Sequence, residues 1–334
     1  MRSFFLLLCL IVLFSCGHAQ LRRFSFTQPK MGAPFTIILY AGDSVTATVA
    51  STSCFSLVDS LVMVLSDYID SSELNRLCAT GGTGQPFACS PALFDVILQS
   101  QQAFEKSNGS FDITLGPLTR LWRKARKENM FPDAALIQEK RRLTGFRKLQ
   151  IDTRQHTVTV TQAGMQLDLG GIGQGYIAQQ VANRLHSLHI ENALVDVSGD
   201  MVTMGKPPGT GGWTVAINLP QSEHELLPAQ LLLTDIAVTT SGDVYQFMEY
   251  RGKRYSHIVD PATGLGITTQ RNVTVIAADG TTADWLTKAC SILSVDKALQ
   301  LAASLHAEVL IANIKNGKLV FYKSKGFSKY WKRM

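Results

Sequence analysis

The stretch EVLIANIKNGKLVFY, from Glu308 to Tyr322, places two apolar runs on either side of Asn316-Gly317. Asn-Gly between such runs is a strong signal for a type I′ hairpin, because both central residues of that turn need a positive φ. We therefore expect paired antiparallel strands over Glu308–Ile314 and Lys318–Tyr322.

Helical and strand patterns alternate irregularly before this hairpin. Ser90-Pro91 has the residue types preferred at N-cap and N1, and apolar residues follow at helical spacing until Asn108-Gly109 ends the helix. Val45 to Tyr68 is also expected to be largely helical. Four further segments read as strands: Met165–Leu169, Leu194–Val197, Trp213–Ile217 and Asn272–Ala277. Hairpins mixed with helices predict an α+β fold with largely antiparallel sheets and packed helices, rather than a doubly wound parallel sheet.

The first residues indicate export. Arg2 precedes an unbroken apolar run from Phe4 to Phe14, which has the length of a signal-peptide core and is too short for a permanent membrane span. Two ends compete. The sequence up to Cys16 resembles a bacterial lipobox, which would make Cys16 a lipidated N-terminus, whereas Gly17-His18-Ala19 resembles an ordinary cleavage site. Residues 1–19 are thus a predicted signal peptide.

The remainder is expected to form one domain over residues 24–325, followed by a basic tail at 326–334. After the leader, no second apolar segment is expected to approach the 18 residues that a membrane-spanning helix needs, so the mature body is expected to be soluble. The cysteines after the leader show no C-x-x-C pair, which argues against zinc and thioredoxin-like sites. Cys78 with Cys89 is the nearest candidate disulfide, and four buried thiols are the alternative.

A net charge of +6 is spread over several basic clusters, and such clusters are usually solvated faces. A nucleic-acid partner is not expected, because no recognisable binding module accompanies the charge. The aromatic residues of the tail leave a membrane-surface role open.

One histidine stands between a strand-like run and a tight turn. It lies in RYSHIVDPATG, from Arg254 to Gly264, where Asp260-Pro261 starts the turn and Gly264 closes it. A single histidine is more often structural than catalytic. At the end of an element, however, the backbone of His257 is held while its side chain can face a cleft.

A glycine cluster, GGIGQG at residues 170–175, follows Asp168-Leu169 and opens a helix running to Leu188. Glycines between a strand and a helix let backbone N–H groups face an anion, typically a phosphate. The spacing is neither the dinucleotide fingerprint nor a P-loop. Close strand–helix packing is the alternative, and Asp168 beside the glycines favours a ligand site.

Two further carboxylates need partners. Asp112 lies among apolar neighbours in a segment expected to be strand-like up to Gly116-Pro117, so it requires either a local N–H group or a ligand. Asp284 lies on one helical face with Thr287 and Lys288 at i+3 and i+4. That face is either an Asp–Lys pair near a helix N-terminus or a set of oxygen ligands for Mg²⁺.

In their order along the chain, these motifs resemble the ApbE family, the FAD:protein FMN transferases. The matching stretches are Lys30–Gly32, Tyr68–Asn75, Gly109–Leu118 with Trp122, Asp168–Tyr176, Thr240–Asp243, Ser256–Gly264 and Ala283-Asp284.

The resemblance implies an α+β, ApbE-like fold with an FAD cleft between lobes. It also implies a Mg²⁺-dependent enzyme that cleaves the FAD pyrophosphate, joins FMN to a Thr or Ser hydroxyl of an extracytoplasmic flavoprotein and releases AMP. His257 is the expected catalytic base. The residues that would line the FAD site are Met31, Tyr68, Ser110, Phe111, Asp112, Asp168, Gln174 and Ile267. The metal would lie between the Gly171 carbonyl and the side chains of Asp284, Thr287 and position 288.

Position 288 departs from the family pattern, which usually has Thr there. A charged lysine offers no lone pair to a cation, so Lys288 could displace the metal by pairing with Asp284. Either Thr287 shifts into ligation or Lys288 itself neutralises the pyrophosphate. Gln174 and Gln179 replace residues more common in the family, without a chemical role being lost.

Three functions therefore stay open: a working transferase, an FAD-binding paralogue without transfer activity, and a Mg²⁺-dependent FAD pyrophosphatase with water as acceptor. For any of them the resemblance and the leader predict an extracytoplasmic location, in the bacterial periplasm or on the membrane as a lipoprotein.

Overall fold

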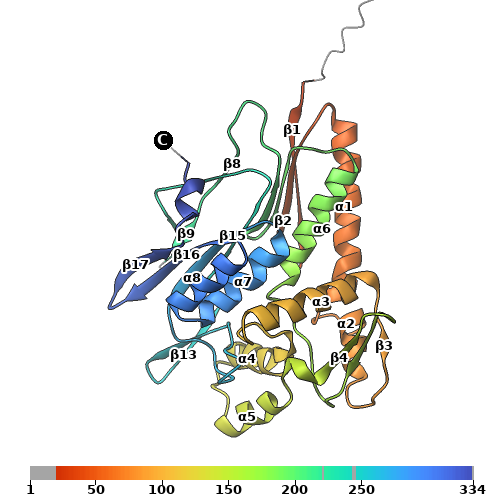
Figure 1. Cartoon of the computed structure of the whole chain (residues 1–334), viewed down its shortest axis with the longest axis vertical. Helices are drawn as coiled ribbons and strands as arrows, with labels where there is room; N and C mark the ends of the chain where they lie inside the picture. Colours follow the sequence, from red (N-terminus) through yellow and green to blue (C-terminus); the bar gives the residue numbers. More distant parts are fainter. Residues whose placement is uncertain (1–19, 220–221, 243–245, 333–334) are drawn as a thin grey trace, which may run out of the picture.

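A central antiparallel sheet organises the computed structural model, which describes residues 20–219, 222–242 and 246–332. The predicted signal peptide, including Cys16, lies outside the described residues. Among the described residues, eight strands pair in the order β1-β2-β6-β7-β12-β15-β16-β17 (Figure 1). They are β1 Arg22–Lys30, β2 Ala33–Ala41, β6 Ala193–Val197, β7 Asp200–Met204, β12 Ala237–Ser241, β15 Arg271–Ala277, β16 Glu308–Lys315 and β17 Lys318–Lys323.

The C-terminal hairpin is confirmed. β16 and β17 pair in antiparallel register from Leu310↔Lys323 to Lys315↔Lys318. Asn316 and Gly317 have φ values of 50° and 72°, as a type I′ turn requires. The predicted α+β fold with antiparallel pairing is therefore correct.

Side chains alternate between the two faces of the sheet, as the period of a strand dictates. Val195, Ala237 and Val275 enter the main core, which the helices α1 Ser44–Leu65, α6 Gly173–Ser187, α7 Gly280–Ile292 and α8 Val295–Ser304 help to form (Figure 1). Their neighbours Leu194 and Val238 face a second core on the opposite side.

The second core contains short strands and the C-terminal segment. Its strands are β8 Trp213–Val215 and β11 Leu231–Leu233, which pair with each other. The 3₁₀ helix η3 Phe327–Tyr330 inserts a fully buried Phe327 there. Residues 326–332, which the sequence sets apart as a basic tail, thus pack against the body. A separate ribbon is formed by β9 Asn218–Leu219 and β10 Ser222–Leu226.

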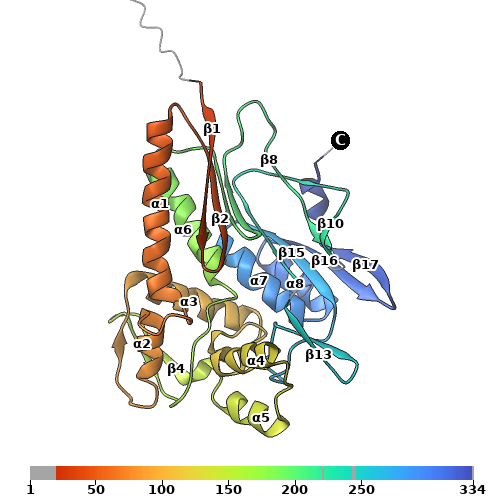
Figure 2. The ribbon, with the colours of Figure 1, turned by 180° about the vertical axis from the view of Figure 1, so that it is seen from behind.

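A helical lobe lies beyond the lower end of α1 (Figure 2). Its elements are α2 Glu73–Ala79, α3 Pro91–Lys106, η1 Ile113–Leu115, α4 Gly116–Glu128, α5 Ala134–Arg142, η2 Phe146–Lys148 and the sheet of β3 Phe87–Ala88, β5 Thr157–Val160 and β4 Leu149–Asp152. The hairpin of β13 Phe247–Tyr250 and β14 Lys253–Ser256 packs on α4 and α5 through a third apolar cluster.

Two predicted strands are wrong. Met165–Leu169 is extended but unpaired as a strand, because Leu167 N–H donates to Cys78 Sγ and Asp168 N–H donates to the Ile113 carbonyl. The segment after Asp112 is helical: η1 leads into α4, with Pro117 in the first turn, where the missing N–H of proline carries no penalty. The local sequence did not reveal these partners because they come from distant segments.

The expectation that no second apolar segment reaches membrane-spanning length is also wrong. In the part of the chain that the structure describes, α1 is long and apolar enough by length and composition alone. It nevertheless contributes Ala47, Cys54, Val58 and Leu65 to the main core. The cysteines Cys54, Cys78, Cys89 and Cys290 are free thiols, two buried and two half-buried, and Cys78 and Cys89 form no disulfide.

Two glycines bring α6 and α7 into close contact. A Cβ on Gly175 would lie 2.1 Å from the Gly280 carbonyl oxygen and 2.6 Å from Asp284 Cβ. A Cβ on Gly280 would lie 2.5 Å from the Gly175 carbonyl oxygen. Gln179 adds a tether, because its Oε1 accepts from Gly280 N–H at 3.0 Å. This contact fixes where the first turn of α7 presents its side chains.

We predict that Gly175→Ala destabilises the protein by about 1–3 kcal/mol or more, because the methyl group would force the two helix backbones apart. Gly173→Ala is the matched control, since its Cβ would meet its nearest neighbour at an ordinary 3.8 Å. Urea unfolding of both variants checks this. Equal stability of the two variants would contradict the role given to the glycine contact.

Candidate active site

His257 follows the last residue of β14 and is held by backbone bonds on both sides. Ser256 N–H donates to the Ile267 carbonyl, and Ile267 N–H donates to the Ile258 carbonyl, both at 2.9 Å. Beyond it, Gly264 N–H donates to the Asp260 carbonyl and closes the predicted turn with a φ of 74°. The sequence-based placement of His257 at the end of a held element is confirmed, and Ile267 is its neighbour across this ladder.

The hydrogen bond of the His257 ring determines its tautomer. Nδ1 lies 3.3 Å from the Gln246 carbonyl oxygen, which also accepts from the backbone N–H of His257 at 2.7 Å. A carbonyl oxygen can only accept, so Nδ1 carries the proton in this bond. Nε2 then keeps its lone pair, as a general base requires.

The surroundings keep the imidazole neutral. Burial, the Lys288 ammonium and the Arg126 guanidinium lower the pKa of His257 to about 4, while the Gln246 carbonyl and Asp168 oppose this effect. The ring is therefore unprotonated at neutral pH. An anion bound nearby would raise the pKa again and strengthen the base.

The four residues predicted to hold a metal do come together. Asp284 is fully buried, and its Oδ2 accepts from Gly175 N–H at 3.0 Å. Its Oδ1 accepts from Lys288 Nζ at 3.1 Å. A Cβ on Gly171 would lie 3.1 Å from Lys288 Cγ, which places the glycine loop against the lysine stem.

This arrangement does not fit a divalent ion. Both carboxylate oxygens of Asp284 already accept hydrogen bonds, one of them from a cation. Thr287 Oγ1 donates to the Asp284 carbonyl at 2.7 Å and accepts from Lys288 Nζ at 3.3 Å. The Lys288 ammonium thus donates hydrogen bonds to the side-chain oxygens of Asp284 and Thr287, which the resemblance assigns to Mg²⁺ as ligands.

Asp200 belongs to the same cluster and was missed by the sequence analysis. It is buried at the start of β7, after the turn formed by Ser198 and Gly199. Burial and the neighbouring Asp284 carboxylate raise the pKa of Asp200 to about 8, against the effect of Lys288. No local motif marks this aspartate, because its proximity to α7 arises only from the sheet.

Arg123 of α4 joins two predicted FAD-lining residues and was also missed. It donates to Asp168 Oδ2 at 3.0 Å and pairs with Asp67. Its guanidinium lies 4.4 Å from the centre of the Tyr68 ring, which is otherwise 76% exposed. The exposed Tyr68 ring therefore lies next to the Arg123 guanidinium and two carboxylates. An aromatic ring in such surroundings can stack against a flat ligand that also carries polar groups.

The predicted residues of the Ser107–Leu118 segment have structural partners. Asp112 Oδ1 accepts from Thr114 N–H at 2.8 Å and Thr114 Oγ1 at 2.7 Å, so it has the local N–H partner that was one of the two alternatives. Burial raises the pKa of Asp112 despite these bonds. Phe111 is buried against Trp285, with ring centres 6.0 Å apart, and contacts the Gly171 position. Ser110, half-buried, precedes it.

The remaining predicted residues lie on separate elements. Met31 has a φ of 52° in the β1–β2 turn and packs at the edge of the main core. Gln174 lies in the first turn of α6, half-buried. Asp243, the last residue of the Thr240–Asp243 motif, lies outside the described residues.

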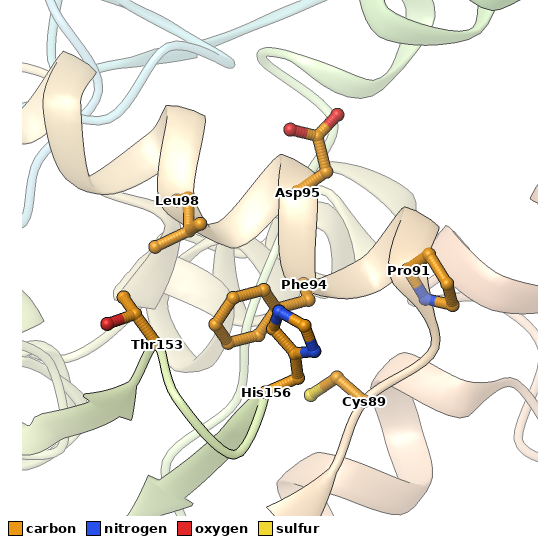
Figure 3. A pocket seen from close by; sticks show the side chains of 7 residues that line it. All are labelled: Cys89, Pro91, Phe94, Asp95, Leu98, Thr153 and His156. Atoms are coloured by element: carbon orange, nitrogen blue, oxygen red, sulfur yellow. The ribbon is translucent and has the colours of Figure 1, made fainter.

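A cavity of about 300 Å³ lies elsewhere, between α3 and the β4–β5 turn (Figure 3). His156 meets Phe94 edge-on there, with ring centres 4.9 Å apart. Burial raises the pKa of the nearby Cys89 thiol to about 12, so that thiol is not a nucleophile at neutral pH. The residues that line this cavity include none of those predicted from the motifs.

The arrangement around His257 and the glycine loop can be compared with known proteins. The profile of the ApbE family matches residues 31–311. The chain belongs to the ApbE family. The resemblance predicted from its motifs is therefore confirmed.

Relatives of this ApbE protein carry a functional name. A Klebsiella pneumoniae protein named FAD:protein FMN transferase is 30% identical over 277 residues, 83% of this chain and 84% of that protein. A Treponema pallidum protein of the same name is 30% identical over 303 residues, 86% of this chain and 83% of the relative. The flavin transferase ApbE from Vibrio cholerae has a TM-score of 0.83 at 26% identity, covering 93% of this chain and 99% of that structure.

The state of His257 gives a testable pH dependence. Its folded pKa of about 4 is below the ordinary 6.5, so the stability from the neutral ring is present above pH 6.5 and is lost as pH falls toward 4. We expect nitrogen NMR of the imidazole to show the Nδ1–H tautomer at pH 6 and a protonation midpoint near pH 4. His257→Gln should lose less stability than the wild type between pH 6.5 and 4. A midpoint near 6.5 would contradict the environment described.

Proposed function

We propose that this protein transfers the FMN moiety of FAD to a Thr or Ser hydroxyl of a partner protein, with His257 as general base. The observation that carries this proposal is the neutral His257 ring, whose Nδ1 is engaged by the Gln246 carbonyl and whose Nε2 keeps its lone pair. Support comes from the relatives named FAD:protein FMN transferase and from the match to the ApbE family.

The chemistry is a phosphoryl-type transfer. The acceptor hydroxyl oxygen forms a bond to the phosphorus of the FMN half of FAD, and the bond from that phosphorus to the bridging oxygen breaks. The hydroxyl proton passes to His257 Nε2, and AMP leaves with the bridging oxygen. The N-terminus of α6, which begins at Gly173, is the positive end of a helix dipole and would stabilise the pyrophosphate charge.

We propose that Tyr68, Asp168, Phe111, Ser110, Asp112, Gln174, Met31 and Ile267 line the FAD site, as the family resemblance implies. Tyr68 and Asp168 share Arg123, and Ile267 adjoins His257; these two sets of contacts support the proposal. Mg²⁺ dependence also follows from the resemblance. It is not part of the proposed mechanism, because Lys288 engages Asp284 and Thr287.

The cellular setting rests on the leader sequence. We propose an extracytoplasmic protein that is either released after Ala19 or anchored through a lipid on Cys16. Its acceptor would then be an extracytoplasmic flavoprotein with a Thr or Ser flavinylation motif.

The test uses protein from residue 20 onward, FAD and a flavin-acceptor domain, followed by AMP release and covalent flavin fluorescence on the acceptor. We expect both signals from the wild type. His257→Ala should lower the transfer rate by about 10²–10⁴-fold, the usual contribution of a general base. His186→Ala, an exposed histidine on α6, is the matched control and should keep the wild-type rate.

Two results would contradict the proposal. AMP release without labelling, at a rate independent of the acceptor, would make the protein an FAD pyrophosphatase. Tight FAD binding without AMP would make it a flavin-binding paralogue, a reading that the Lys288–Asp284 pair favours.

A further inference from the structure

Two of the three N–H donors of the Lys288 ammonium have side-chain oxygens as partners, and the side chain is partly exposed. Its ammonium has three N–H donors, of which Asp284 Oδ1 and Thr287 Oγ1 use two, at 3.1 and 3.3 Å. Asp284 is completely buried, whereas the Lys288 side chain remains 20% exposed.

The glycine loop fixes the position of this ammonium. Any Cβ on Gly171 would meet Lys288 Cγ at 3.1 Å and Phe111 at 3.2 Å, so the loop, the aromatic ring and the lysine stem are in close contact. The helix N-terminus of α6 begins two residues later, at Gly173. One fixed cation thus lies near the N-terminus of α6, the positive end of a helix dipole.

The charge of Lys288 also reaches His257. The ammonium is close enough to contribute to the lowered pKa of the imidazole. Lys288 Nζ lies 3.1 Å from a carboxylate oxygen of the buried Asp284, and this ion pair favours the charged form of the lysine.

We propose that Lys288 binds the pyrophosphate of FAD in the place of a divalent cation, so that the protein needs no such ion to hold or cleave FAD. This inference rests on the proposed function and assigns the electrostatic role within it. A compact ammonium can donate directly to a phosphate oxygen and stabilise the charge that grows on the departing AMP phosphate. A purely structural Lys288–Asp284 pair would make neither contribution.

Binding measurements test this without relying on transfer. Flavin fluorescence titrations with FAD in excess chelator should give the same affinity for the wild type as titrations with Mg²⁺. Lys288→Met should weaken FAD binding in chelator by about tenfold or more, as expected for the loss of a charge-assisted hydrogen bond. Lys297→Met, an exposed lysine of α8, is the matched control and should bind normally.

Metal binding gives a second readout. Electron paramagnetic resonance with Mn²⁺ and FAD should show no bound ion in the wild type. Lys288→Thr, which supplies a hydroxyl and releases Asp284, should bind Mn²⁺ and FAD together. Transfer by the wild type should persist in chelator, whereas transfer by Lys288→Thr should depend on added Mg²⁺.

Removing Lys288 alone leaves a buried carboxylate without its cation, and such a variant can fail to fold. Lys288→Met combined with Asp284→Asn removes both charges, while the Asn side-chain oxygen can still accept from Gly175 N–H. This double variant should show the same weakened FAD binding.

The outcomes separate this inference from the proposed function. Mn²⁺ bound by the wild type, Mg²⁺-dependent FAD binding, or unchanged FAD affinity in the folded double variant would each overturn the role of Lys288. A wild type that binds FAD through Lys288 without releasing AMP would support the binding role and overturn only the transfer function.

Discussion

The buried carboxylate of Asp284 is the interaction on which the rest of the site depends. One oxygen accepts from the backbone of α6 and the other from Lys288 of its own helix. Because an unpaired buried carboxylate is costly, these bonds fix both the helix contact and the lysine position. They can form only because Gly175 and Gly280 let the two helix backbones approach closely. A packing constraint between helices therefore determines where the Lys288 charge lies.

The charges of the site complement one another. His257 is neutral and has one acceptor nitrogen, Lys288 is a cation, and Arg123 balances the carboxylates of Asp67 and Asp168. Burial and the neighbouring Asp168 raise the pKa of Asp67, which Arg123 opposes. The result is a site that can accept a proton at one point and hold anionic oxygens at another.

The sequence predicted those features that depend on local chemistry. Asn316-Gly317 specified its turn, Ser90-Pro91 specified a helix start, and the spacing of Asp284 and Lys288 allowed their pair to be anticipated. The sequence-based predictions failed where the local structure depends on contacts with a distant part of the chain. The residues 165–169 satisfy their backbone through Cys78 and Ile113 instead of a strand partner. Asp200 and Arg123 escaped notice for the same reason, since only the folded sheet and the helical lobe bring them to the site.

A lysine ammonium stands where the family resemblance predicts a divalent ion. The most direct measurement is a crystal structure of the FAD complex grown with Mn²⁺, with anomalous scattering used to locate the ion. We predict pyrophosphate oxygens within hydrogen-bond distance of Lys288 Nζ and no anomalous peak beside Asp284. A Mn²⁺ peak between Asp284 and the Gly171 carbonyl, with Lys288 turned away, would contradict the account.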